Sequence, residues 1–228
     1  MDTRIKGVLL DIDGTLLDSN EAHARSWAEI FQRNRRDIPF ERVRPLIGKG
    51  GDKLLPELTG LKHDSPEGKR LSEERKKLFG EKYFPNLKPT RGARELVERL
   101  QREGLRVVIA TSSSGDELDK LLDKAGVLDL IDRATSSDDG DSKPDPDIIE
   151  AALAKGKLKA SEAVMVGDTP YDVEAAARAK VKAIALRCGG WWDDAALSKA
   201  AAIYDDPAEL VAELERSPIN VRVGIAQE

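Results

Sequence analysis

The chain of 228 residues is long enough for one large domain or for two domains of unequal size, and its composition, 40% hydrophobic and 35% charged, is typical of a globular protein. Its 37 basic and 42 acidic residues give a net charge of −5. This balance argues against general binding of nucleic acid or of an anionic membrane, because such binding needs basic clusters. A small anionic ligand is not excluded, since a few local cations are enough to hold one phosphate.

The chain has one cysteine, Cys188, so it can form neither an intrachain disulfide nor a thiolate metal cluster. No apolar run approaches the roughly 18 residues that a membrane span requires. These two features predict a soluble protein of a reducing compartment, the cytoplasm.

Short apolar runs alternate with amphipathic stretches along most of the chain. Such alternation is typical of a parallel sheet covered by helices, and we expect a Rossmann-like α/β fold. The expected strands cover residues 5–10, 105–110, 163–166 and 183–186, with a weaker one over 133–136. The expected helices cover about residues 91–103, 116–125, 146–156 and 171–180.

Residues 18–86 interrupt this alternation. Their pattern is helical throughout, with a strongly amphipathic stretch over 21–33, and contains no convincing strand. We therefore expect a small all-helical cap inserted after the first strand, joined by hinges near 16–19 and 85–89. The predicted domains are a core of residues 1–17 and 87–216, the cap of 18–86, and a tail of 217–228 that is either disordered or paired with something else.

Two acids follow the first expected strand. Asp11 and Asp13 stand two residues apart, so in an extended chain their side chains project to the same side, and Gly14 lets the backbone turn away. Asp and Gly are also ordinary turn residues, which is the alternative. A functional role is favoured, because a buried strand seldom ends in two acids so close together.

Hydroxyl side chains follow the second expected strand, where Thr111, Ser112, Ser113 and Ser114 precede Gly115. Hydroxyls and free N–H groups in front of a helix form a natural phosphate cradle. The alternative is a helix cap, with Ser114 or a neighbour capping the helix that begins near residue 116. Both interpretations can be true together: Thr111 and the neighbouring Ser112 would bind the ligand, and a later serine would cap the helix.

Two further clusters carry charge. Lys143 lies beside Pro144 in a polar loop, where a lysine by itself is usually solvated. Asp168 ends an expected strand, and Asp172, four residues on, shares its face in a helical turn. The preference of acids for helix N-termini explains Asp172 well and Asp168 poorly. All four clusters fall at the carboxyl ends of expected strands, where open α/β sheets bind ligands.

The order and spacing of DIDGT at residues 11–15, Thr111, Lys143 with Pro144, and GDxxxD at residues 167–172 resemble the four motifs of the haloacid dehalogenase-like hydrolase superfamily. The resemblance extends from about residue 5 to residue 212 and is to the branch that includes phosphoglycolate phosphatase and β-phosphoglucomutase. It implies a magnesium-dependent phosphatase acting on a small phosphorylated metabolite, such as a sugar phosphate or phosphoglycolate. The helical insertion resembles the small mobile cap of this branch.

The resemblance also implies a role for each core residue. Asp11 is expected to be the nucleophile that forms an aspartyl-phosphate, which divides one difficult displacement into two. Asp13 is expected to protonate the leaving oxygen and later to take a proton from water. Thr111 and Lys143 are expected to bind the transferring phosphoryl group, with Ser112 contacting the substrate.

The same resemblance implies the metal ligands. Mg²⁺ prefers oxygen and is expected on the carboxylates of Asp11 and Asp168 and on the backbone carbonyl of Asp13. Asp172 is expected behind these ligands, where it orients the site or holds Lys143.

Three cap residues are candidates for contact with the substrate. His23 lies twelve residues beyond Asp11, an offset similar to that in β-phosphoglucomutase and related sugar-phosphate phosphatases, but an ordinary helix-face histidine is an equal alternative. Lys49 and Lys53 lie in a glycine-rich loop that meets the leaving group in relatives, against the alternative of two surface lysines. Outside the cap, Trp191 and Trp192 either pack on the sheet edge or form a dimer contact.

Three functions are open at this point. A phosphatase and a phosphomutase of the β-phosphoglucomutase type share every core residue named above, and phosphate release against isomer formation separates them. A non-catalytic binding module of the same fold is the third, and it predicts the loss of at least one catalytic acid. The acids Asp11, Asp13 and Asp168 are all present, as is Lys143. We expect a small-molecule partner, neither nucleic acid nor membrane, and a monomer or homodimer.

Overall fold

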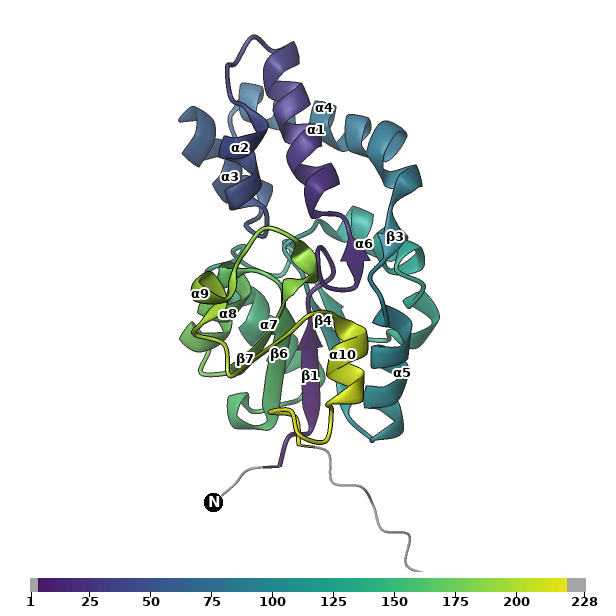
Figure 1. Ribbon diagram of the computed structural model, residues 1–228. Helices are drawn as coiled ribbons and strands as arrows, with labels where there is room; N and C mark the ends of the chain where they lie inside the picture. The colour runs from purple at the N-terminus through teal and green to yellow at the C-terminus, as the bar shows by residue number, and fades with distance from the viewer. Residues whose placement is uncertain (1–3, 221–228) are drawn as a thin grey trace, which may run out of the picture.

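The computed structural model describes residues 4–220 and has a six-stranded sheet at its centre (Figure 1). The strand order is β5-β4-β1-β6-β7-β8, and every neighbouring pair is parallel. The strands are β1 (Gly7–Leu10), β4 (Arg106–Ala110), β5 (Ala134–Thr135), β6 (Ala163–Gly167), β7 (Lys182–Leu186) and β8 (Ala202–Tyr204). The predicted parallel α/β core is confirmed.

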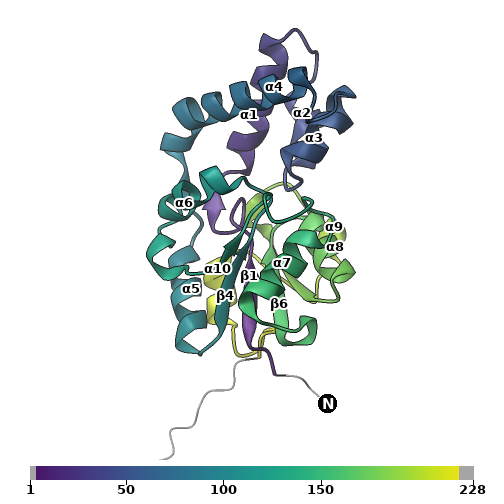
Figure 2. The same cartoon turned by 180° about the vertical axis from the view of Figure 1, so that it is seen from behind.

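Alternate residues of each central strand pack on opposite faces of the sheet, because the side-chain period of a strand is two. In β1, Val8 and Leu10 belong to one buried apolar cluster and Leu9 to another. Helices α5 (Ala93–Arg102), α6 (Gly115–Lys124) and α10 (Pro207–Ala212) supply the first cluster, and α7 (Asp147–Gly156) and α8 (Pro170–Arg178) supply the second. Figure 2 shows these two helical layers on either side of the strands. Buried on both faces, the central strands are therefore apolar along their whole length, as parallel strands usually are.

The four longest helices of the core begin and end within two residues of the expected helices. The core helices are α5 (Ala93–Arg102), α6 (Gly115–Lys124), α7 (Asp147–Gly156), α8 (Pro170–Arg178), α9 (Asp194–Leu197) and α10 (Pro207–Ala212). Three short 3-10 turns are η4 (Leu128–Leu130), η5 (Ala160–Glu162) and η6 (Arg187–Gly189). Ser114 is the residue before α6, but its side chain makes no cap hydrogen bond and donates to Glu117 instead. The predicted capping by the Ser114 side chain is wrong.

A helical cap stands beyond the carboxyl-end edge of the sheet, inserted after β1 (Figure 1). Its elements are α1 (Asn20–Arg33), α2 (Phe40–Val43), η1 (Arg44–Leu46), α3 (Gly51–Thr59), α4 (Pro66–Leu78), the π-turn η2 (Phe79–Tyr83) and the 3-10 turn η3 (Phe84–Asn86). The cap has its own apolar core, in which Trp27, Ile30 and Phe31 of α1 are buried. This agrees with the amphipathic pattern of residues 21–33.

The two connections between cap and core pair with each other. β2 (Leu17–Asp18) and β3 (Lys88–Pro89) form a short antiparallel ribbon. These are the segments predicted as hinges, and the helical pattern gave no indication that they would bond to one another. Because both connections run side by side, the cap is attached along one edge. The division of the chain into core and cap at residues 18 and 86 stays a proposal.

Two parts of the core differ from the expectation. β8 was not foreseen, because its three residues are only half-buried and follow a run of small and charged residues. The first residues of the predicted tail are packed, since Ser217 and Ile219 are buried and Ile219 belongs to the main apolar cluster. Residues 221–228 lie outside the described part of the chain.

Candidate active site

The candidate site lies at the carboxyl ends of the three central strands. The register pairs Leu10 of β1 with Ile109 of β4 and with Val166 of β6. The polar residues that follow these strands, among them Asp11 and Asp168, therefore emerge side by side. The chain continues from β1 to β4 on one side and returns to β6 on the other, so this edge is a topological switch point, where open sheets bind ligands.

Three buried carboxylates converge there. Asp11, Asp168 and Asp172 each offer an oxygen, and these oxygens lie within 4.8 Å of one another. Lys143 lies between two of them, with its Nζ 2.7 Å from Asp11 Oδ1 and 2.6 Å from Asp172 Oδ1. Its side chain is 1% exposed. A cation that completely buried is stable only because the carboxylates pair with it.

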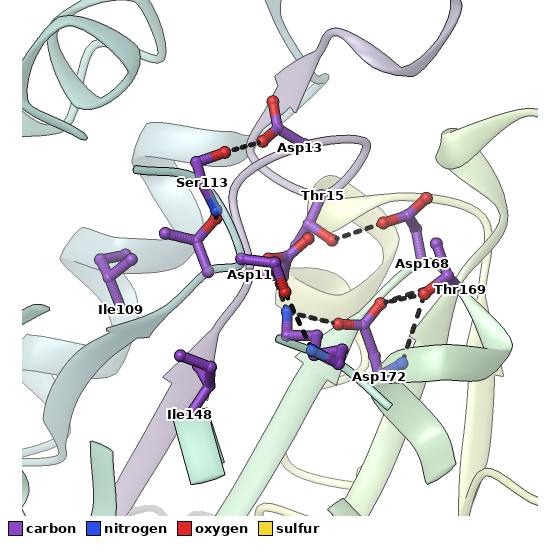
Figure 3. Close-up of polar contacts among 12 residues, drawn as sticks. Asp11, Asp13, Thr15, Ile109, Ser113, Ile148, Asp168, Thr169 and Asp172 are labelled. Carbon is purple, nitrogen blue, oxygen red and sulfur yellow. Dashed lines mark hydrogen bonds and ion pairs between the residues drawn. The ribbon is translucent and has the colours of Figure 1, made fainter. Parts of the chain in front are cut away.

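The remaining oxygens of Asp168 and Asp172 are held by neighbouring donors (Figure 3). Thr15 Oγ1 donates to Asp168 Oδ1 at 3.2 Å, and Asn20 Nδ2 donates to Asp168 Oδ2 at 2.7 Å. The backbone N–H and the hydroxyl of Thr169 both donate to Asp172 Oδ2. Thr169 also caps α8, in which Pro170 occupies the first turn. Asp172 is therefore committed to Lys143 and Thr169, which fits its predicted position behind the metal ligands.

The cluster carries excess negative charge. Burial, together with Asp172 and Asp13, raises the pKa of Asp11 to about 7 in spite of Lys143. Burial, together with Asp172 and Asp11, raises the pKa of Asp168 well above its usual range. Burial would lower the pKa of Lys143, but Asp11 and Asp172 raise it above the ordinary value. Three carboxylates against one lysine leave room for a divalent cation, and an all-oxygen donor set suits Mg²⁺.

Asp13 lies apart from this cluster, next to the cap (Figure 3). Ser113 Oγ donates to Asp13 Oδ2 at 2.7 Å, and Ser19 Oγ donates to Oδ1 at 2.5 Å. His23 Nε2 lies 2.8 Å from the same Oδ1. Burial would raise the pKa of Asp13, but His23 and the two serines lower it below the usual range. The two acids of the first motif thus have different environments, which suits different roles.

A cavity of about 550 Å³ opens between core and cap above Asp11 and Asp13. Thr111 and Ser112 line it from the core. Ser112 Oγ also accepts the backbone N–H of Lys143, and Thr111 Oγ1 accepts that of Ser113, so the two predicted phosphate contacts also fix their own loop. The structure therefore brings together every core residue that the sequence predicts for the site.

The cap side of the cavity is organised around His23. Its ring stacks on Phe79 with the centroids 4.2 Å apart, and its Nδ1 faces the guanidinium of Arg75. Arg75 in turn donates to Ser26 and lies over the rings of Trp27 and Phe79. His23 therefore connects the cap to the carboxylate of Asp13. This favours a functional position for His23 over an ordinary helix-face residue.

The two lysines of the glycine-rich loop differ. Lys49 lines the cavity, pairs with Glu57 at 2.5 Å and lies 5.0 Å from the centre of the Tyr171 ring. Lys53 pairs with Asp145 of the core and is not among the residues that line the cavity within residues 4–220. The predicted contact of Lys53 with substrate therefore has no support from its position. It joins cap to core instead.

Close approach of this loop to the core depends on glycine. A Cβ at Gly48 would lie 2.7 Å from Thr169 Cγ2, and one at Gly50 would lie 2.1 Å from Ser142 Oγ. Gly48 also has a φ of 109°, which favours glycine. The loop thus reaches residues next to Asp168 and Lys143.

The tryptophan pair lies beside the same loop. Trp192 packs on the second core cluster and edge-on to Tyr171, whose hydroxyl donates to the carbonyl of Pro45 in the cap. Trp191 is 42% exposed and lies under the guanidinium of Arg44. The pair therefore borders the junction of core and cap. Its predicted role in a dimer contact stays a prediction.

Four residues of this region were not singled out from the sequence, namely Ser113, Asn20, Arg75 and Arg44. Ser113 had a local signal, since it stands in the hydroxyl cluster after β4. The others had none, because their partners lie far along the chain: Asn20 contacts Asp168, 148 residues away, and Arg75 contacts His23, 52 residues away.

Fold and site together define an α/β enzyme with a helical cap over a buried carboxylate cluster. A family model described as haloacid dehalogenase-like hydrolase matches residues 8–186. The chain belongs to the haloacid dehalogenase-like hydrolase family, which confirms the resemblance read from its motifs. Among the residues that the structure describes, no helix is both long and apolar enough to span a membrane.

Individual relatives extend this likeness to nearly the whole chain. The chain is 29% identical over 227 residues to an N-acetylmuramic acid 6-phosphate phosphatase of Pseudomonas aeruginosa, covering 94% of this chain and 96% of the relative. It is 28% identical over 178 residues to a phosphoglycolate phosphatase of Nitrosospira multiformis, covering 75% and 78%.

Solved structures agree in fold. A hydrolase from Pseudomonas syringae has a TM-score of 0.85 and 29% identity, covering 93% of this chain and 98% of that one. A β-phosphoglucomutase from Clostridium difficile has a TM-score of 0.78 and 18% identity, covering 93% and 96%. The second likeness is one of fold alone.

Proposed function

We propose that this protein is a magnesium-dependent phosphatase that hydrolyses the phosphate monoester of a small metabolite through an aspartyl-phosphate on Asp11. One observation carries the proposal. Asp11 lies at the base of the cavity, with one carboxylate oxygen held by Lys143, next to Asp168 and two residues before a second acid in a separate environment. A nucleophile, a phosphate-binding cation, a metal ligand and an acid–base group are thus within reach of one phosphoryl group.

In the first half of the reaction, an oxygen of Asp11 attacks phosphorus, and the bond from phosphorus to the ester oxygen breaks. Asp13 delivers a proton to that oxygen, and His23, 2.8 Å away, is placed to exchange a proton with Asp13. Lys143, Thr111 and the N–H groups of its loop stabilise the charge on the phosphoryl oxygens.

In the second half, Asp13 accepts a proton from water as the water oxygen attacks phosphorus and the bond to Asp11 breaks. Asp13 is ionised at this stage because it has already delivered its proton to the leaving oxygen in the first half. Asp11, Asp168 and the backbone carbonyl of Asp13 would hold Mg²⁺, which would supply positive charge to offset that of the phosphoryl group. Asp172 keeps Lys143 in place through the 2.6 Å ion pair between them.

The relatives favour hydrolysis over isomerisation. The N-acetylmuramic acid 6-phosphate phosphatase and the phosphoglycolate phosphatase both release phosphate according to their names, and they are more similar in sequence than the β-phosphoglucomutase named above. A mutase is the second candidate, supported by the shared fold. A binding module without turnover is the remote one, because Asp11, Asp13, Asp168 and Lys143 are all present.

For the substrate, we favour a sugar phosphate over phosphoglycolate. The cavity of about 550 Å³ is of the size that encloses a small ligand with a ring, and the nitrogen-bearing side chains of His23, Lys49 and Arg75 are among those that line it. We further propose a cytoplasmic enzyme, monomeric or dimeric, whose partner is this metabolite and not nucleic acid or a membrane.

A panel of small phosphate esters, assayed with Mg²⁺ for phosphate release and for isomer formation, tests the proposal. We expect stoichiometric phosphate release, with at least one sugar phosphate turned over faster than phosphoglycolate. Isomer formation without phosphate release would make the mutase correct. No turnover of any ester by protein that binds Mg²⁺ would contradict the proposed function.

A further inference from the structure

A buried arginine of the cap contacts the core away from the substrate cavity. Arg44 of η1 is 3% exposed, and its Nη2 donates to the carbonyl of Gly189, in the turn that follows β7. Its guanidinium lies 5.4 Å from the centre of the Trp191 ring. Within residues 4–220, its buried Nη1 has no hydrogen-bond partner. Such a charge is expensive to bury, so a specific role is indicated.

The same carbonyl receives a second donor. Asn20, the first residue of α1, donates from Nδ2 to Gly189 O at 3.3 Å and to Asp168 Oδ2 at 2.7 Å. Asn20 is 2% exposed, and its Oδ1 is a buried acceptor with no partner in the described part of the chain. The carbonyl of Gly189 thus accepts hydrogen bonds from both Arg44 and Asn20. Each of these side chains has one further buried atom without a partner in the described part of the chain: the donor Nη1 of Arg44 and the acceptor Oδ1 of Asn20.

Gly189 is part of this arrangement because it has no side chain. A Cβ there would lie 1.8 Å from Asp168 Oδ2. The turn can therefore approach the carboxylate closely enough for its carbonyl to share Asn20 with Asp168. The result is a continuous contact from the cap, through Arg44, Gly189 and Asn20, to Asp168.

We propose that Arg44 and Asn20 are a positioning pair that holds Asp168 in the orientation for binding Mg²⁺ when the cap rests on the core. Because Arg44 Nη1 and Asn20 Oδ1 are both buried without a partner in the described part of the chain, a hydrogen bond between them, direct or through one water, would lock the amide of Asn20 on Asp168. Groups that orient metal ligands in this way typically change metal affinity about 10- to 100-fold when removed. The inference rests on the proposed function, since it takes Asp168 as a metal ligand.

A direct substrate contact is the alternative for Arg44, and the geometry argues against it. Among the described residues, those that line the 550 Å³ cavity include His23, Lys49 and Arg75 but neither Arg44 nor Asn20. Both residues of the pair act on Asp168 from the side of the Gly189 turn. They are therefore positioning residues and not catalytic ones.

The test is Mg²⁺ binding to metal-free protein by isothermal titration calorimetry. We compare wild type, Arg44→Met, Asn20→Ala and the double variant, with Arg42→Met as the control, because Arg42 is exposed and lies two residues away. Each single change should raise the Kd for Mg²⁺ about tenfold, and the double variant should lie within about twofold of the weaker single variant, since the two act as a unit. Arg42→Met should bind as wild type does.

A second measurement separates positioning from mere packing. In both single variants, saturating Mg²⁺ should restore kcat on p-nitrophenyl phosphate to within about threefold of wild type, because only the metal affinity is affected. If Arg44→Met does not fold by circular dichroism, Arg44→Lys replaces it. Lysine keeps the charge and one contact but lacks the planar fork, so its Kd should still rise at least about threefold.

The possible failures are distinct. Wild-type protein that binds no Mg²⁺ contradicts the proposed function itself. Wild-type protein that binds Mg²⁺ while folded Arg44 variants bind it equally well overturns only the positioning pair. Fully additive losses in the double variant also overturn it, because two independent contacts would then act on Asp168.

Discussion

The core half and the cap half of the site are built differently. In the core, Asp11, Lys143 and Asp172 form a buried ion-paired chain with contacts of 2.6 and 2.7 Å, and each acid directly follows a strand or opens a helix. In the cap, Lys49 pairs with exposed Glu57 and Lys53 with half-buried Asp145. His23 is held by Arg75 from a different helix. The core half is fixed by the sheet, whereas the cap half depends on how helices pack.

We infer from this difference that the core half carries the chemistry and the cap half the selectivity. A nucleophile and its cation need positions fixed to a fraction of an ångström, which a parallel sheet buried on both faces supplies. Leaving-group recognition can tolerate partly exposed ion pairs, whose contribution to stability is small and which can be exchanged for substrate contacts. Changes in the core should therefore affect every substrate equally, and changes at cap residues that line the cavity should affect substrates differently.

The largest effect is expected from Asp11→Asn. It keeps the shape of the side chain but removes the attacking charge, so phosphate release should fall by roughly 10³ or more on every substrate. The fold should survive, because an amide relieves repulsion with Asp168. The measurement is kcat on p-nitrophenyl phosphate and on the best sugar phosphate, with Asp37→Asn as an exposed control. Near-normal turnover by Asp11→Asn would exclude the covalent mechanism.

The next largest effect is expected from metal removal. The site offers carboxylates and, in the described part of the chain, no cysteine or histidine ligand set. Turnover should therefore fall at least about 100-fold in excess EDTA and return with Mg²⁺. The protein should elute from a sizing column unchanged after chelation, which separates loss of metal from unfolding. Full activity in EDTA would contradict the metal roles of Asp11 and Asp168.

A smaller effect concerns the stability of the metal-free protein. A carboxyl whose pKa is raised on folding stabilises the fold below its unfolded pKa, and this stabilisation is lost as pH rises through the folded pKa. For Asp11 the window extends from about 3.8 to about 7. The Tm of metal-free protein should therefore fall over this range, on the order of 5–10 °C more than that of Asp11→Asn.

Mg²⁺ provides the control for this pH effect, because it favours the ionised carboxylates. With Mg²⁺ present, the wild-type Tm should depend less on pH above about 6. Thermal unfolding followed by circular dichroism at several pH values measures both curves. Identical pH dependence in wild type and Asp11→Asn would show that this carboxyl is not under strain from burial.

The same contrast explains what could be predicted from the sequence. Asp11, Thr111 and Asp168 directly follow β1, β4 and β6, so their place at the carboxyl ends of parallel strands was enough to bring them to one edge. Lys143 lies in a polar loop and could be assigned to the site only through resemblance. His23 could be proposed only through resemblance. Arg75, Asn20 and Arg44 could not be found, because each depends on the packing of cap against core and leaves no local pattern in the sequence.

Strand β8 and the tail show a second limit of prediction from the sequence. β8 (Ala202–Tyr204) is only half-buried, so it lacks the apolar run that marks the central strands. Ile219 looked like part of a loose tail, because its burial comes from contact with residues distant in the chain. Periodicity predicts elements that are buried by their own pattern, and it misses those buried by tertiary contact alone.

The smallest change in turnover, and the sharpest test of the contrast, is expected from the loop that begins at Gly48. Lys49→Ala with Lys53→Ala should alter the ranking of substrates, because Lys49 lines the cavity and Lys53 holds the loop on Asp145 of the core. Hydrolysis of p-nitrophenyl phosphate should stay within about tenfold, since that ester relies mainly on the core residues. The matched control is Lys69→Ala with Lys77→Ala, two exposed lysines of α4. Ratios of kcat/KM across the ester panel are the measurement. An unchanged ranking would make both lysines ordinary surface residues, and an equal collapse on every ester would place them in the chemistry itself.

The single variants then separate the two lysines. Lys49→Ala should reproduce the change in ranking. Lys53→Ala should raise KM for all esters alike, because it loosens the cap without removing a contact to the leaving group.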